Sequence, residues 1–353
     1  MNTTRFTLMS AACLALLVGT VARAATIKTV PVGNAGNASD SQSQGDFGAV
    51  DHKYRIGKSE VTNSQYAEFL NGVDPTGANA LALYNNSMSS DARGGINFNG
   101  GAANGLKYEI KLGRDNNPVT FVSWYDSIRF ANWLHNNQAA GDTENGAYTL
   151  GTLGAGGIPT SGNSITRNAN ATWFLPSEDE WYKAAYHKND GATGNYWDYT
   201  TATDAVPFSD QPPGSDAPTQ SNTANFRKND SIANFYDDGY AVTGSNTLVG
   251  AQNYLTDVGA YTLSASPYRT FDQGGNVIEW NEARIGNLRG LRGGSWSSPF
   301  NGGLGASARG NANPSSEFNT FGFRVGVNVP EPGTLALAGL ALVGLAACAR
   351  RRK

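Results

Sequence analysis

The sequence predicts an irregular, loop-rich α+β domain with little regular secondary structure. Of its 353 residues, 43 are glycine and only 16% are charged. Seven Trp, 15 Tyr and 15 Phe are available to build a core. This composition argues against a helical bundle. It favours a fold in which aromatic clusters hold long irregular segments in place.

Three helices are expected, each from a capping signal that is followed by apolar residues at helical spacing. The first opens at Thr62 with Gln65 three residues later, which is a capping box. The second starts at Ser123 with Asp126 at the third position. The third starts at Ser177, and the three acidic residues after it suit the positive N-terminal end of a helix.

The remaining segments are expected as short strands and loops. Short β-like runs, such as residues 258–263 and 323–327, are broken by Gly and Asn. Residues 136–172 and 200–256 are expected to form long surface excursions. No repeat of fixed period is present, so the sequence predicts one irregular domain.

The first 24 residues have the pattern of a secretory signal peptide. Arg5 supplies the positive region, residues 6–21 are apolar, and Ala22-Arg23-Ala24 forms a small-x-small cleavage site. A permanent membrane anchor is the alternative, but the apolar run is short and ends in small residues. Signal peptidase is therefore expected to remove residues 1–24. Residues 25–45 are expected as a linker or N-terminal segment before a domain at 46–328.

The C-terminal segment, residues 329–353, has an ordered pattern of its own. Pro330, Glu331 and Pro332 precede an apolar stretch at 334–349 and a basic cluster. The stretch is marginal for spanning a bilayer, which needs about 20 residues, and the basic cluster favours the cytoplasmic side. This order resembles the PEP-CTERM sorting signal of Gram-negative bacteria that make exopolysaccharide. The resemblance implies a transient transmembrane anchor that an exosortase cuts, leaving the protein on the cell surface or secreted.

Removing both ends changes the cysteine and charge counts. The two cysteines of the chain, Cys13 and Cys348, lie in the removable segments, so the mature chain has no thiol for disulfide or thiolate–metal chemistry. Without the six basic residues and one acidic residue of those segments, 20 basic and 28 acidic residues remain, a net charge of −8. Such an acidic chain is not expected to bind nucleic acid or anionic lipid. It suits cations or neutral glycans.

Six short segments stand in a recognisable order between about residues 46 and 328. They are Glu60-Val61-Thr62-Asn63 with Tyr66; Pro118-Val119 with Val122-Ser123-Trp124; Leu175-Pro176-Ser177-Glu178 with Glu180-Trp181; Gly275-Asn276-Val277 with Glu279-Trp280; Arg292-Gly293-Gly294-Ser295-Trp296; and Arg309 with Gly322-Phe323-Arg324. In these segments the chain resembles formylglycine-generating enzymes and the wider sulfatase-modifying-factor family. The resemblance implies an irregular α+β variant of the C-type lectin fold.

A binding cleft is expected near the paired glycines of the fifth segment. Two adjacent glycines allow close backbone approach or positive φ, so the residues after them can be presented at a concave surface. The cleft candidates are Ser295, Trp296, Ser298 and Arg309. The alternative is that the arginines form buried carboxylate or carbonyl pairs and that the tryptophans are core anchors.

The resemblance also implies catalytic ligands that this chain lacks. In the active enzymes, two cysteines after the Gly-Gly-Ser motif bind copper(I) and carry the oxidation of a sulfatase cysteine to formylglycine. The first matching position is Ser298, and the second lies between Asn301 and Gly303. A hydroxyl cannot replace a soft thiolate as ligand to copper(I). Another branch of the family holds iron with histidines, but the three histidines here are widely spaced. Neither copper nor iron is expected.

Two loops resemble the calcium sites of the family. The first supplies two carboxylates and two carbonyls, from Asp272, Glu279, Gly275 and Val277. The second supplies two side chains and two carbonyls, from Asn234, Asp238, Phe235 and Tyr240. Oxygen ligands of this kind suit a hard cation, which would be structural here. The alternative is that these polar groups cap turns.

Three functions remain open from the sequence. The first is a non-catalytic, calcium-supported binding or matrix protein of the envelope or exopolysaccharide layer, with a glycan or an envelope protein as its ligand. The second is an oxidoreductase of the family's own class that acts on a protein substrate through unrecognised ligands. The third is a purely structural envelope component.

Overall fold

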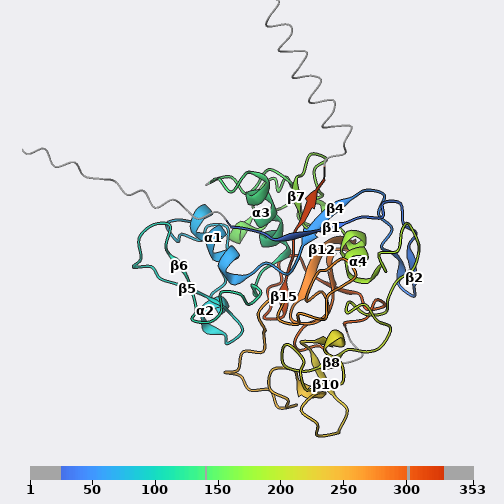
Figure 1. Ribbon diagram of the computed structural model, residues 1–353. Helices are drawn as coiled ribbons and strands as arrows, with labels where there is room; N and C mark the ends of the chain where they lie inside the picture. The colour runs from blue at the N-terminus through green and yellow to red at the C-terminus, as the bar shows by residue number, and fades with distance from the viewer. Residues whose placement is uncertain (1–24, 140, 300–302, 330–353) are drawn as a thin grey trace, which may run out of the picture.

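The computed structural model describes residues 25–139, 141–299 and 303–329. The signal peptide and the Pro330, Glu331 and Pro332 motif with its apolar stretch lie outside these residues. Within them, short helices and strands are joined by long irregular connections, as expected for a loop-rich α+β domain (Figure 1). None of the helices in this part of the chain is long and apolar enough to cross a membrane.

All three helices expected from capping signals form. In α1, Thr62 Oγ1 accepts a hydrogen bond from Gln65 N at 3.3 Å and Gln65 Oε1 accepts one from Thr62 N at 2.9 Å. The same reciprocal caps start α3 and α4. The helices are α1 (Asn63–Val73), α2 (Ser87–Ser90), α3 (Trp124–His135) and α4 (Glu178–Tyr186), with 3-10 turns η1 (Ala155–Gly157), η2 (Gly162–Ser164) and η3 (Gln220–Asn222).

Two four-stranded sheets form the centre of the domain. The first has the order β1-β4-β16-β7 and is antiparallel, with strands Thr29–Val32, Tyr54–Gly57, Gly326–Asn328 and Trp173–Phe174. The second has the order β14-β13-β12-β15, with strands Gly310–Ala312, Leu288–Arg292, Ile278–Ile285 and Phe321–Gly322. In the second sheet, β15 runs parallel to β12 and the other pairs are antiparallel.

Four two-stranded sheets lie outside the two central sheets. They are β2 (Asp40–Gln42) with β3 (Gly45–Phe47), β5 (Ile96–Phe98) with β6 (Tyr108–Ile110), β8 (Phe208–Ser209) with β9 (Thr223–Ala224), and β10 (Arg227–Asn229) with β11 (Asp238–Tyr240). In Figure 1, β5, β6 and α2 lie on one side of the central strands, and β2 lies on the other.

The main core is aromatic and lies between α1, α3 and the central strands. Phe69 and Phe130 meet edge to face, with ring centroids 5.3 Å apart, and Phe130 meets Phe323 at 5.4 Å. Trp133 packs 5.4 Å from Phe69. Aromatic pairs in these geometries add roughly 0.5–1.5 kcal/mol each beyond the burial of their area. The apolar faces of α1 and α3 are therefore held together by rings from three separate segments.

Residues 25–45, expected as a linker or N-terminal segment, are an N-terminal segment that packs on the domain, because β1 pairs with β4 along its length and Val32 is buried. Two expected strands are wrong. Residues 258–263 form turns instead of a strand, with Gly259 at φ +76°. The run at 323–327 is not one strand either: pairing stops at Gly322 and resumes at Gly326, and the residues between them pack inward.

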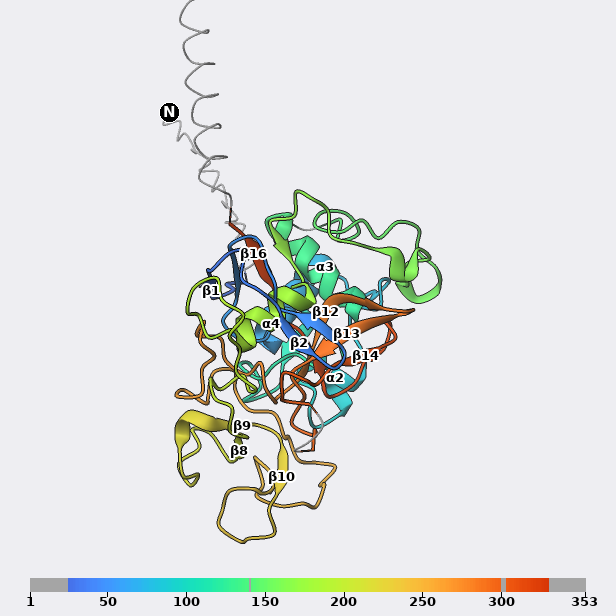
Figure 2. The ribbon, with the colours of Figure 1, turned by 90° about the vertical axis from the view of Figure 1, so that its right-hand side faces the viewer.

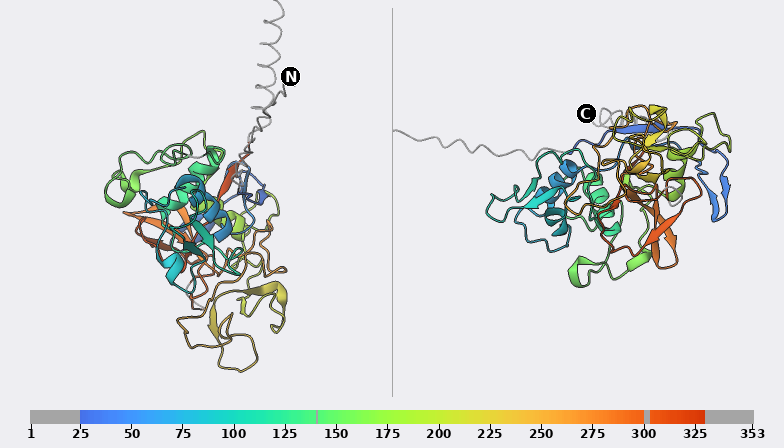
Figure 3. Two further views of the ribbon diagram at one scale, coloured as in Figure 1. Left: turned by 90° about the vertical axis from the view of Figure 1, so that its left-hand side faces the viewer. Right: turned by 90° about the horizontal axis from the view of Figure 1, so that it is seen from below.

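The two expected excursions are irregular but anchored. Residues 200–256 carry β8 to β11, and Figure 2 shows them as the yellow lobe at the foot of the domain. Residues 136–172, in green, run along the edge of the molecule in the left view of Figure 3. Tyr148 and Leu150 from the green segment and Tyr254 from the yellow one are buried, so side chains tie both excursions to the domain.

Candidate functional site

The paired glycines form a tight turn that only glycine suits. Gly293 has φ +96° and Gly294 has φ +67°, in the left-handed region that L side chains rarely adopt. A Cβ on Gly293 would lie 2.2 Å from the carbonyl oxygen of Gln273. The turn follows β13 directly and places Gly293 against the 272–276 loop, where its carbonyl accepts a hydrogen bond from Gly275 N at 2.9 Å.

The serines after this turn face each other. Ser298 Oγ accepts a hydrogen bond from Ser295 N at 2.9 Å, and the two hydroxyl oxygens are 3.4 Å apart. A Cβ on Gly303 would lie 3.2 Å from Ser298 Oγ. Ser298 and Gly303 are thus neighbours in space. Ser298 stands where the resemblance places the first thiolate, and Gly303 ends the range 301–303 in which it places the second. Neither residue offers a soft ligand.

Trp296 is a core residue. Its ring stacks on Tyr254 with centroids 4.9 Å apart at an interplanar angle of 10°, and it also contacts Tyr240. The indole N–H donates to the carbonyl of Asn319, and the side chain is buried. These contacts match the core-anchor alternative better than a ligand platform.

Arg309 lies in an ion pair with the first residue of α4. Its guanidinium donates to both carboxylate oxygens of Glu178, at 2.8 and 2.6 Å. Arg292 donates to Glu178 as well and also reaches the carbonyls of Ala306 and Ala308. The Glu178 carboxylate therefore joins Arg292, at the end of β13, and Arg309, in the following loop, to the start of α4.

A second buried ion pair joins Arg324 to Glu279, at the end of the 272–279 loop. Arg324 donates to both oxygens of Glu279, each at 2.6 Å, and both side chains have 0% exposure. Trp181 Nε1 also donates to Glu279, at 2.8 Å. Both carboxylate oxygens of Glu279 therefore accept hydrogen bonds from protein donors.

Asp272, the other carboxylate of the expected calcium set, precedes this buried pair in the same loop. It has positive φ (58°), and its Oδ2 accepts a hydrogen bond from Gly259 N. Burial raises the pKa of Asp272 to about 6. The hydrogen bond from Gly259 and the charge of Arg324 act in the opposite direction and lower this pKa. Gly275 and Val277, whose carbonyls complete the expected calcium set, lie in the same loop, and both are buried.

Glu60 approaches this loop from the end of β4. Its Oε1 accepts a hydrogen bond from Asn276 Nδ2 at 3.2 Å. Burial, followed by the charge of Asp272, raises the pKa of Glu60 well above its ordinary value. The charge of the Asp272 carboxylate thus favours the protonated form of Glu60.

The second expected calcium loop is a capped turn. Asp238 Oδ2 accepts hydrogen bonds from the backbone N–H groups of Phe235 at 2.9 Å and Asn234 at 3.3 Å. Phe235 itself is exposed, and the ring of Tyr240 packs on Tyr254 at 4.6 Å. This geometry matches the turn-capping alternative, because Asp238 closes the connection between β10 and β11.

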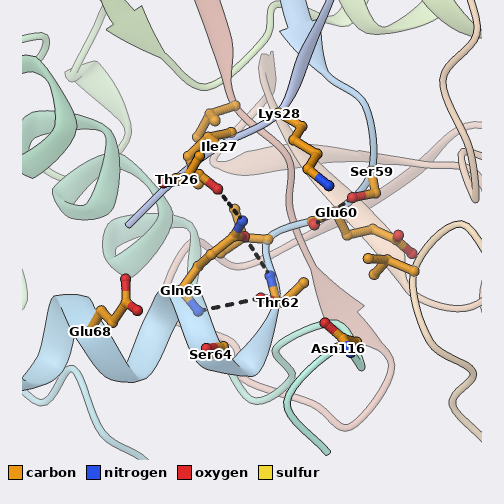
Figure 4. Close-up of a pocket in the computed structure, with 13 residues that line it drawn as sticks. Thr26, Ile27, Lys28, Ser59, Glu60, Thr62, Ser64, Gln65, Glu68 and Asn116 are labelled. Carbon is orange, nitrogen blue, oxygen red and sulfur yellow. Dashed lines mark hydrogen bonds between the residues drawn. The ribbon is translucent and has the colours of Figure 1, made fainter. Parts of the chain in front are cut away.

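A polar cavity of about 300 Å³ opens beside Glu60. Its lining includes Lys28, Ser59, Glu68 and Asn116 in addition to Glu60. Figure 4 shows the Glu60 carboxylate on the side of the cavity opposite Glu68. The residues that line this cavity come from the segment before β1, the segment between β4 and α1, α1 itself, and the connections that carry Asn116, Val258 and Val325. The four cleft candidates are not among them.

A second cavity, of about 270 Å³, holds another carboxyl pair. Asp126, at the start of α3, accepts hydrogen bonds from Ser123 N and Oγ, and it lies against Glu317. Burial, and then the charge of Asp126, raises the pKa of Glu317 to about 8. Burial raises the pKa of Asp126 to about 6.

Sequence reasoning missed the roles of two glutamates. Glu60 and Glu178 both stood in the matching segments, yet neither was a candidate ligand or ion-pair partner. Glu60 lies three residues before α1 and Glu178 is the first residue of α4, so their positions at helix starts were the local signal that could have singled them out. Their partners are more than 100 residues away, so the sequence offered no way to name them.

The family of the chain follows from its sequence. The model of the sulfatase-modifying factor enzyme 1-like domain family matches residues 20–329, and the chain belongs to this family. It is a member that also carries a PEP-CTERM protein-sorting motif, at residues 328–352. The expected fold and sorting signal are thereby confirmed. No curated protein matches the chain.

Solved structures include several that are similar to this chain. CarF shares 18% identity at a TM-score of 0.47, covering 86% of this chain and 99% of CarF. Variable protein 1 of Treponema denticola shares 19% identity at a TM-score of 0.45, covering 86% and 95%. PvdO from Pseudomonas aeruginosa shares 15% identity at a TM-score of 0.44, covering 87% and 99%.

Proposed function

We propose that this exported, exosortase-processed protein is a non-catalytic, calcium-supported binding or matrix protein of the envelope or exopolysaccharide layer. Its PEP-CTERM motif implies export to the envelope or surface, and its domain is of the sulfatase-modifying-factor type. A glycan or an envelope protein is the proposed ligand. The calcium ion supports the loops and takes no part in chemistry.

The observation that carries this proposal is the pair of neighbouring positions Ser298 and Gly303. These residues lie side by side, but Ser298 carries a hydroxyl group and Gly303 has no side chain. Cys13 and Cys348, the cysteines of the chain, both lie in the segments that processing removes. A thiolate pair for copper(I) therefore cannot form in the mature protein.

The loop at 272–279 supports the calcium part of the proposal. Asp272 offers a carboxylate there, with the backbone of Gly275 and Val277 close by. Calcium prefers carboxylate and carbonyl oxygens. A bound ion would stiffen loops that the cysteine-free domain cannot cross-link.

The first test is elemental analysis of the purified mature protein after dialysis against trace calcium. The proposal expects calcium at one or two ions per chain with no stoichiometric copper or iron, and no oxygen consumption with thiol-containing peptides. Stoichiometric copper or iron together with oxygen consumption would instead establish an oxidoreductase with unrecognised ligands.

The binding role is tested separately on a glycan array. Binding that survives washing and is competed by the free glycan supports a specific ligand. Binding to no glycan and to no envelope protein in a pull-down would leave a purely structural component as the better description.

A further inference from the structure

The guanidinium of Arg289, on β13, is buried without a carboxylate partner. Arg289 is 1% exposed, and its Nη1 donates to the carbonyl of Glu282 at 2.9 Å. Its Nη2 donates to two further carbonyls, of Asn163 and Ile165, at 3.0 and 2.6 Å. Within the described residues, its Nε has no hydrogen-bond partner. Carbonyl oxygens carry only partial charge, so a full positive charge is buried here without a counter-ion, which is costly.

A second arginine without an ion pair stands directly opposite Arg289. Arg284, on β12, is its cross-strand partner, so both side chains project from the same face of the sheet. Arg284 is exposed, and the described part of the chain gives it no ion-pair partner. Burial, and then the charge of Arg284, lowers the pKa of Arg289 to about 10. Both residues are therefore charged at neutral pH, and like charges at opposing positions repel each other.

Both arginines line one cavity of about 140 Å³. The other residues of its lining are Trp124, Tyr148, Ile165, Thr166, Arg167 and Glu282. Trp124, Tyr148 and Ile165 are buried, whereas Thr166 and Arg284 are exposed, so the cavity opens to the surface beside these two. A water molecule occupies about 30 Å³ in the liquid, so the cavity has room for a group of a few heavy atoms.

The charges of this lining favour an anion. Three arginines and one glutamate give it a formal net charge of +2, in a chain whose overall charge is negative. Glu282 is already engaged by Arg167, which donates to its two oxygens at 2.9 and 2.7 Å. Arg167 also pairs with Glu180, and with this carboxylate counted the group still has an excess positive charge. Arg284 and Arg289 remain as the charges that an anion would balance.

We propose that this cavity binds a carboxylate group, and that the natural source of this group is the uronic acid of an acidic glycan. Arginine forms paired, charge-assisted hydrogen bonds with carboxylates. A carboxylate between Arg284 and Arg289 would balance the buried charge and relieve the repulsion between them. The choice of a sugar acid rests on the proposed glycan-binding function, and it adds the charged group by which the glycan is recognised.

Local charge decides this preference. The net charge of the chain favours neutral glycans, but salt screens exposed charges that lie more than about 10 Å apart. A ligand group inside the cavity therefore meets the arginines of the β12–β13 pair, which Figure 2 shows side by side, before it meets the distant acidic residues.

The test is calorimetric titration of sodium glucuronate into the mature protein, in chelator so that calcium plays no part. Glucose is the uncharged counterpart, and sodium acetate is a carboxylate without a sugar. Wild type is expected to bind glucuronate at one site, acetate more weakly, and glucose not detectably. Equal binding of acetate and glucuronate would overturn the assignment to a sugar acid.

Three variants test the residues. Arg284→Gln and Arg289→Met are expected to bind glucuronate at least about fivefold more weakly, because each removes a charged partner of the carboxylate. The matched control is Arg269→Gln, which removes an exposed arginine outside the cavity lining and should bind as wild type does. Since Arg284 is exposed, Arg284→Gln is expected to melt as wild type does without ligand and to lose the rise in melting temperature that glucuronate gives wild type.

The outcomes separate this site from the wider function. Wild-type affinity in Arg284→Gln, or no binding of glucuronate by wild type, would overturn the inference, while binding of neutral glycans on the array would keep the proposed function. Glucuronate binding that Arg284→Gln weakens would support the site even if no glycan on the array were bound.

Discussion

Replacing Arg324 by Met should be among the most destabilising single changes in this domain. The guanidinium is fully buried and makes four hydrogen bonds, two to Glu279 and one each to Gly57 O and Phe271 O. Removing one partner of a buried ion pair costs about 3–5 kcal/mol, because the other charge is left uncompensated. Here the buried Glu279 carboxylate would lose its guanidinium partner, so we expect a loss of about 4–5 kcal/mol in the free energy of unfolding.

Urea denaturation measures this loss. With an m value of about 3 kcal/mol/M, a loss of about 4 kcal/mol lowers the unfolding midpoint by about 1.3 M. Arg284→Met is the matched control, because Arg284 is an exposed arginine on β12, the strand that carries Glu279, and its loss should change stability by less than about 0.5 kcal/mol. A loss below about 2 kcal/mol in Arg324→Met would refute the argument that this pair anchors the loop.

Two further measurements examine the mechanism of the loss. The double variant Arg324→Met with Glu279→Gln should lose less than the sum of the two single variants, because it removes both partners. The unpaired carboxyls of Arg324→Met should bind protons more readily in the folded than in the unfolded state. The stability of this variant relative to wild type should therefore improve as the pH is lowered. Additive single losses and no such pH trend would point to lost packing alone.

The remaining predictions concern other parts of the fold. The pKa of Glu317 is raised from 4.5 to about 8, mainly by burial, so the folded state binds more protons than the unfolded state in this range; stability should fall as the pH rises from about 4.5 to about 8. Glu317→Gln should flatten this dependence in urea titrations at several pH values, and an unchanged slope would contradict it. Trp296→Ala should cost about 3–5 kcal/mol of unfolding free energy as a core truncation, and a near-neutral result would reopen its role as a ligand platform. Gly293→Ala should cost about 3 kcal/mol or more, because it combines positive φ with a backbone clash, and a stable variant would show that the turn can rearrange. Thr62→Ala should cost about 1 kcal/mol through loss of its cap on α1, measured by thermal melting, whereas no change would mean that the cap is dispensable.

The helices were predictable because their signals are local. Thr62 with Gln65, and Ser123 with Asp126, satisfy the first amide groups of a helix from within the same turn, so the sequence alone predicts where α1 and α3 begin. The strands were not predictable in the same way. β1 is four residues long and is stabilised by β4, more than 20 residues away, so residues 25–45 gave no local signal of pairing.

The candidate site was predictable in its composition but not in its pairing. The sequence placed Ser298 and a residue near Gly303 where the family has thiolates, and the structure sets the two side by side. It also named Asp272 and Glu279 as a pair of ligands, but the structure pairs Glu279 with Arg324 and sets Glu60 near Asp272. Which carboxylate meets which cation depends on contacts between distant segments.

The sequence by itself determined the family of this protein, its sorting motif, and the placement of its two cysteines near the two ends of the chain. It did so because signal segments, capping boxes and soft metal ligands depend on residue type and short spacing. Only the tertiary structure decided that Trp296 is a core residue, that Glu178 joins Arg292 to Arg309, and that the Glu60 carboxylate is buried with a free oxygen. Burial and charge pairing are set by side chains more than 100 residues apart, and they exist only once the chain has folded.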